Sequence, residues 1–139
     1  MTTPLQTQYT VLNERRLHFG RMFWQNIAFH IVGVLLVLYL LVQMKPERPT
    51  VAIALVAIGL ATLLMSFIAH RLQRLEVIYE NHLAAIETHW LATGETGIQR
   101  PPVSGRFSSR LIVIWALGLV GLVFILLGLA GAPLIPVGP

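Results

Sequence analysis

Three long apolar runs dominate the chain, at about residues 23–43, 51–69 and 111–130, and none of them contains Asp, Glu, Lys or Arg. Each is close to the roughly 20 residues that an α-helix needs to cross a bilayer. A charge at the centre of such a helix costs about 2.5–3.5 kcal/mol on insertion, so uncharged runs of this length predict three transmembrane helices. The runs are apolar on all sides, which disfavours helices of a soluble core. The predicted fold class is an all-α integral membrane protein.

A different pattern follows the second run. Between residues 70 and 90 there is no Gly or Pro, and large residues recur every three or four positions, which predicts an amphipathic helix. Its stripe consists of Leu72, Leu75, Tyr79, His82, Leu83, Ile86, His89 and Trp90. One helix over residues 51–93, about 64 Å long and capped by Gly94, accounts for both patterns. The alternative is a bend near residues 70–71 that lays the second half on the membrane surface.

Polar and helix-breaking segments set the remaining boundaries. Residues 1–11 are expected to form a flexible tail, and a basic, aromatic collar over 12–23 is expected to start the first helix. Pro46 and Pro49 predict a tight outer connection, with Pro49 in the first turn of the next helix. Ser108 or Ser109 is a suitable N-cap for the third helix. The predicted segments are 1–22 (tail and collar), 23–44, 51–69 and 110–131 (transmembrane helices), 45–50 (outer loop), 70–93 (cytoplasmic amphipathic helix), 94–109 (cytoplasmic loop) and 132–139 (outer tail).

The charges lie outside the apolar runs and predict an orientation. The net charge is +4, and all ten Lys and Arg residues flank the runs. Eight of them fall before the first run or between the second and third, against two between the first and second. The positive-inside rule therefore predicts a multi-pass protein of the inner (cytoplasmic) membrane with a cytoplasmic N-terminus and an outer C-terminus. This accounts for the basic balance without a nucleic-acid partner. Because the first 22 residues are polar, we expect no cleavable signal peptide.

Residue types that carry most enzyme chemistry are scarce. The chain has no Cys and no Asp, and none of its six glutamates lies in an apolar run. Disulfides, thiolate metal sites and thiol catalysis are therefore excluded. There is no nucleophile–base–acid set, phosphate-binding glycine loop or metal-ligand cluster. The sequence therefore predicts neither an enzyme nor a binder of a soluble substrate.

His30 is the only histidine inside an apolar run. An imidazole in lipid usually has a partner or a task. Asn26, one turn earlier, could hydrogen-bond it, or a neighbouring helix of a larger assembly could. Alternatively, His30 is an axial ligand to a bacteriochlorophyll-type pigment or a haem, or it relays protons. His82 and His89 are about 10.5 Å apart along a helix, too far to share a metal ion.

Small residues form stripes in two of the runs. In the third run the glycines fall on one helical face, and in the second run the alanines do so. Such stripes let helix backbones approach closely in lipid, so they predict packing sites. The stripes comprise Gly118, Gly121, Gly128 and Gly131, and Ala54, Ala57 and Ala61.

The pattern as a whole favours a non-catalytic accessory or scaffolding subunit of a larger membrane complex, for which an energy-converting respiratory or photosynthetic complex is one setting. The expected partners are other membrane subunits, through the stripe of residues 70–90, and bound lipid. The first alternative is a cofactor-binding subunit that uses His30. The second is a homo-oligomeric channel, although no ring of charge or filter sequence is present.

Overall fold

The computed structural model describes residues 4–92 and 108–131, and all regular structure in these ranges is α-helical. The helices are α1 (Pro4–Met44), α2 (Arg48–Ala92) and α3 (Ser109–Leu129). Each contains a segment long and apolar enough to cross a membrane. The predicted all-α class and the three apolar helices are therefore confirmed.

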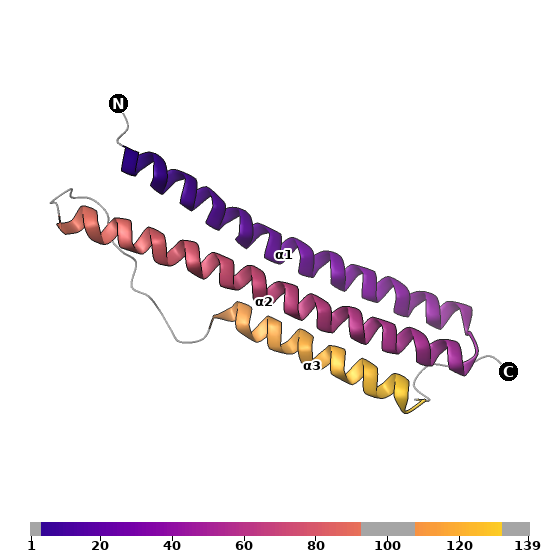
Figure 1. Ribbon diagram of the computed structural model, residues 1–139. Coiled ribbons are helices and arrows are strands. Elements are labelled where there is room, and N and C mark those ends of the chain that lie inside the picture. Colours follow the sequence, from indigo (N-terminus) through magenta and orange to yellow (C-terminus); the bar gives the residue numbers. More distant parts are fainter. Residues whose placement is uncertain (1–3, 93–107, 132–139) are drawn as a thin grey trace.

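α2 is the central element, and the other two helices pack along it (Figure 1). At 1.5 Å per residue the helices are about 61, 67 and 31 Å long in chain order. α3 thus matches the roughly 30 Å hydrocarbon core of a bilayer, whereas α1 and α2 are about twice as long. We call residues 23–44, 48–69 and 109–129 the apolar layer. The antiparallel pair formed by residues 4–22 and 70–92 is the hairpin arm.

α2 passes from the apolar layer into the hairpin arm as one helix (Figure 1). The predicted continuous helix is confirmed, and the alternative bend at residues 70–71 is absent. The helix is described as far as Ala92. The expected Gly94 cap, the loop over 94–107 and the tail over 132–139 lie outside the described residues.

The start of α1 differs from the prediction of a flexible tail over residues 1–11. The helix already begins at Pro4, a residue type that suits a first helical position. Five residues later the Tyr9 ring lies 5.0 Å from the Trp90 ring at the far end of α2. The tail prediction was wrong because this segment carries few apolar residues, and its helix is stabilised by packing on α2 rather than by its own composition.

The helix ends follow local signals in the sequence. α1 stops where Lys45 adopts a positive φ of 43° and Pro46 follows. α2 starts at Arg48, which puts Pro49 in its first turn as predicted. Ser108 is the N-cap of α3, and its Oγ accepts a hydrogen bond of 3.3 Å from the Arg110 backbone N–H.

One row of α2 residues is hidden over the whole length of the helix. The row repeats at alternating steps of four and three, which is the 3.5-residue period of a left-handed coiled-coil seam. Its members are Val51, Leu55, Ile58, Thr62, Met65, Ala69, Leu72, Glu76, Tyr79, Leu83, Ile86 and Trp90, all buried except the half-buried Glu76 and Tyr79. α1 and α2 are therefore joined by a single seam that crosses from the apolar layer into the hairpin arm.

Candidate functional site

The hairpin arm covers its own apolar stripe. Leu83, Ile86 and Trp90 are buried. Aromatic pairs link the two helices, because Phe19 stacks on Tyr79 at a centroid distance of 5.5 Å and Tyr9 packs on Trp90. Aromatic pairs of this kind contribute about 0.5–1.5 kcal/mol beyond their buried area. The arm therefore has a small hydrophobic core of its own.

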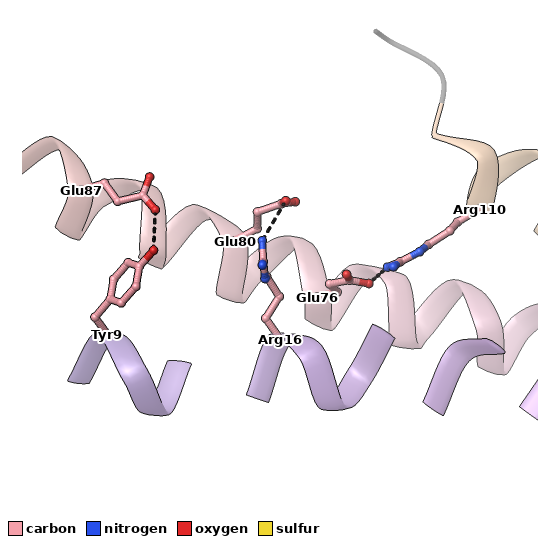
Figure 2. Close-up of polar contacts among 6 residues, drawn as sticks. All are labelled: Tyr9, Arg16, Glu76, Glu80, Glu87 and Arg110. Carbon is pink, nitrogen blue, oxygen red and sulfur yellow. Dashed lines mark hydrogen bonds and ion pairs between the residues drawn. The ribbon is translucent and has the colours of Figure 1, made fainter. Parts of the chain in front are cut away.

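Polar pairs also join α1 to α2 along the arm (Figure 2). The Tyr9 hydroxyl donates a hydrogen bond of 2.9 Å to Glu87 Oε1. Arg16 lies 3.7 Å from Glu80 in a largely exposed ion pair. These contacts pair residues far apart in the sequence, so they fix the alignment of the two helices along the arm.

This packing changes the argument for a protein partner at the stripe. We expected the stripe to need another protein because it is too apolar to stay exposed, but α1 supplies that cover within the chain. Leu72 is also buried, and Leu75 and Tyr79 are half-buried. His82 and His89 lie off the seam and are exposed, and His82 Nδ1 bonds the carbonyl of Ile78 at 2.7 Å. Binding of another subunit at these residues stays a prediction, but exposure of the apolar stripe no longer supports it.

All three helices meet where the hairpin arm joins the apolar layer. Arg110, in the first turn of α3, forms an ion pair with Glu76 of α2 (Figure 2). Its guanidinium also lies over the Phe23 ring of α1, 5.4 Å from the centroid. Gly20 makes room for it, because a Cβ there would lie 3.3 Å from Arg110 Nη2. Gly20 itself is buried at this junction.

Below this junction lies the main core cluster of the described residues. It consists of Phe23, Ile27, Met65, Ala69, Leu72 and Ile114. The cluster contains residues from every helix, so the junction is held both by apolar contact and by the charges of Arg110 and Glu76. This is the only place in the described ranges where a charged pair and a three-helix core coincide.

His30 has a partner on α2 rather than on its own helix. Its Nε2 lies 3.0 Å from the Oγ1 of Thr62, a residue that is 2% exposed. The Thr62 hydroxyl in turn donates to the carbonyl of Ile58 at 2.8 Å. Because that hydroxyl proton is already used, Thr62 Oγ1 accepts from His30, and Nε2 carries the imidazole proton. The expected hydrogen bond is thus made inside the chain, rather than to a helix of a larger assembly or to Asn26.

This hydrogen bond occupies the less hindered ring nitrogen of His30. Nδ1 is left as the acceptor, and it adjoins the side chain's own Cβ. His30 borders two open grooves of about 380 and 690 Å³ with otherwise mostly apolar linings. A planar cofactor would have to reach Nδ1 from such a groove or displace Thr62. The described residues contain no group of three or more potential metal ligands.

The predicted glycine stripe of α3 faces α2. A Cβ on Gly121 would lie 2.9 Å from the backbone oxygen of Gly59, and one on Gly128 would lie 2.7 Å from the oxygen of Ala52. Gly118 sits beside Ser66, whose hydroxyl donates to the Ile114 carbonyl at 2.8 Å. Gly121 and Gly128 thus lie at close backbone approaches between the two helices, whereas the nearest atom to Gly118 belongs to a side chain.

The remaining stripe residues have other surroundings. Gly131 lies beyond the end of α3, adopts a positive φ of 62° and has open space where a Cβ would be. Its backbone N–H donates to the Gly128 carbonyl, so it ends the helix and packs on nothing in the described chain. Ala54, Ala57 and Ala61 line the open groove beside α1 rather than facing α3. A packing role for these alanines stays a prediction.

Sequence reasoning missed residues that lie inside the seams but are polar or small. The apolar pattern is interrupted by Thr62, Glu76 and Arg110. The 3.5-residue repeat of α2 was therefore not apparent in the sequence. Gly59 was isolated in its run, although a Cβ there would come within 2.7 Å of the Gly121 oxygen. A search for steps of four and three that admits Thr, Gly and paired charges would have found both faces of α2.

Comparison with known proteins identifies no relative of this chain. Neither a family model, nor a curated protein, nor a solved structure matches it.

Proposed function

We propose that the chain is a non-catalytic membrane subunit that crosses the inner membrane three times and holds a rigid hairpin arm in the cytoplasm for a larger complex. The apolar layer is its anchor. The hairpin arm, about 34 Å long over residues 70–92, is its projecting part. The basic residues near the arm support this orientation through the positive-inside rule.

The observation that carries this proposal is the unbroken seam between α1 and α2. A loop or hinge at the membrane surface would let the arm swing, but both helices continue through the junction. Arg110 and Glu76 also tie the start of α3 to the base of the arm. The arm is thus fixed in direction relative to the layer, as a scaffold requires.

The surfaces left for partners are the broad faces of the apolar layer. Phe29 of α1 is 77% exposed and Trp115 of α3 is 75% exposed. Lipid can cover such residues, and so can the helices of another subunit. The uncovered groove that Ala57 lines beside α1 has the small side chains that close helix contact requires.

The test is photo-cross-linking in the native membrane, followed by purification in mild detergent. A photoreactive residue at Ala57 should cross-link to a discrete membrane protein, and Ala57→Leu should reduce its co-purification at least fivefold. A photoreactive residue at Val11, which is exposed on the arm, tests in the same way for a partner in the cytoplasm. Recovery of the chain alone from both positions would contradict the scaffold proposal.

A cofactor-binding role is the second candidate, because His30 borders two apolar grooves. The purified chain would then show a haem or bacteriochlorophyll absorption band that disappears in His30→Ala. Thr62→Val is the informative companion variant, because it frees His30 Nε2 without removing the imidazole. A spectrum without such a band in the membrane-extracted protein would exclude this role.

A further inference from the structure

The side of α2 that faces α3 is longer than α3. Residues at alternating steps of four and three contact α3, namely Ala52, Val56, Gly59, Leu63 and Ser66. α3 begins at Ser109. The same row of α2 therefore continues past the start of α3 as His70, Gln73 and Val77, which line an open groove.

This groove extends down into the apolar layer. Its upper part has a volume of about 420 Å³ and includes Arg74. Its lower part, of about 400 Å³, runs along the α2·α3 seam past Phe67 and Trp115. The two parts share His70 and Leu111, so they form one continuous surface groove. Both parts have a mainly apolar lining, and Gln73 and Arg74 line only the upper one.

The charge at the top of the groove has no counterpart among the described residues. Glu76 is paired with Arg110, and Glu80 with Arg16. No described carboxylate lies within ion-pair distance of Arg74, which is exposed. An anionic group beside Arg74 is therefore favoured electrostatically.

The depth of these residues matches the parts of a phospholipid. Position 70 is the first after the uncharged run of α2, so it marks the edge of the hydrocarbon core. Arg74 lies about 6 Å further along the helix. The headgroup layer of a leaflet is about 5–7 Å thick, so Arg74 is at the depth of lipid phosphates. Phe67 and Trp115 lie on the hydrocarbon side.

We propose that this groove binds one anionic phospholipid, with its phosphate beside Arg74 and His70 and an acyl chain along Phe67 and Trp115. The proposal rests on the membrane insertion of the proposed function but not on the scaffolding role. The other possible occupant is residues 93–107 of the same chain. That segment carries Arg100 and Arg106 against a single Glu95, so its charge does not complement Arg74.

The first experiment measures lipid retained by the full chain, using native mass spectrometry after exchange into nanodiscs of equal phosphatidylglycerol and phosphatidylcholine. We expect one retained phosphatidylglycerol, and about a fivefold lower retention in Arg74→Gln, which corresponds to the roughly 1 kcal/mol of one basic residue near an anionic surface. Arg71→Gln is the matched control, because Arg71 is exposed on the same helix but does not line the groove. Equal losses in both variants, or equal retention of both lipids, would overturn the proposal.

The second experiment uses the absence of cysteine from the chain. Gln73→Cys places one thiol in the groove at headgroup depth, and His82→Cys places one on the exposed side of the same helix. Phosphatidylglycerol should slow maleimide labelling at position 73 at least threefold, whereas phosphatidylcholine should not, and labelling at position 82 should be unaffected. Slow labelling at position 73 with either lipid would indicate that residues 93–107 fill the groove, and would exclude the lipid.

Discussion

The two helix seams of this protein are built in different ways. Between α2 and α3, backbones approach at glycines, and a Cβ on Gly59 would lie 2.7 Å from the Gly121 oxygen. Between α1 and α2 in the hairpin arm, large aromatic side chains fill the space, as Phe19 does against Tyr79. The glycine contacts between α2 and α3 lie in the apolar layer, whereas the arm is the polar end of the molecule.

The contrast follows from the solvent expected at each seam. In lipid, apolar side chains gain little by leaving an equally apolar medium, so helices associate through close packing of small residues. In water, burial of aromatic and aliphatic surface contributes about 25 cal/mol per Å², so large residues are the efficient choice. The ion pair between Arg110 and Glu76 lies where the apolar layer meets the arm.

The largest expected effect comes from enlarging the glycine seam. Gly59→Leu should destabilise the chain by about 3 kcal/mol or more, since the new side chain meets the backbone of α3 and cannot be absorbed by a rotamer change. Gly33→Leu should change stability little, because nothing lies within 4 Å of a Cβ there. Unfolding in SDS titrations measures both. Equal stability of the two variants would mean that α3 does not pack on α2 as described.

Breaking the junction should have the next largest effect. Removal of one partner from a fully buried pair costs about 3–5 kcal/mol, and the partial exposure of Glu76 and Arg110 reduces our expectation for Glu76→Gln to about 2 kcal/mol. Glu80→Gln is the matched control, since its ion pair with Arg16 is largely exposed and should contribute less than about 0.5 kcal/mol. The same SDS titration compares them. A larger loss in Glu80→Gln would reverse the ranking of the two ion pairs.

The aromatic packing of the arm should be separable from the apolar layer. Trp90→Ala should lower the free energy of local opening at the end of the arm by about 1–2 kcal/mol. This is less than the roughly 3–5 kcal/mol for truncating a large side chain in a central core, because Trp90 lies near a helix end. Hydrogen exchange should therefore accelerate in residues 4–12 and 84–92 only. Leu17→Ala, at an exposed arm position, should leave exchange unchanged. Faster exchange throughout the apolar layer would show that the two regions unfold as one.

The smallest expected effect is a pH dependence of the arm at alkaline pH. Burial, and then the hydrogen bond and charge of Glu87, raises the pKa of Tyr9 above its ordinary value of 10.0. A group with a raised folded-state pKa contributes stability below its unfolded pKa and loses it as the pH rises through the folded pKa. Exchange of residues 4–12 should therefore become relatively faster above pH 10. Tyr9→Phe should abolish this extra acceleration, and its persistence in that variant would assign it to another group.

Much of the fold was readable from local patterns. The uncharged runs predicted three apolar helices, the spacing beyond residue 70 predicted the continuation of α2, and Ser108 and Pro49 predicted their helix ends. These signals depend on each segment's own composition and on backbone preferences, so no knowledge of neighbours is needed. The glycines of α3 also indicated a packing face, because small residues in an apolar helix have few other uses.

Only the tertiary structure decided which surfaces face one another. The sequence determined that the stripe around Tyr79 must be covered, but the packing shows that α1 covers it. It likewise determined that His30 needs a hydrogen-bond partner, and the fold supplies Thr62 from another helix. Which residues of a helix need to be buried depends on that helix alone, so it can be predicted from the sequence. The choice of partner depends on the register between helices, which polar pairs distant in sequence fix in space.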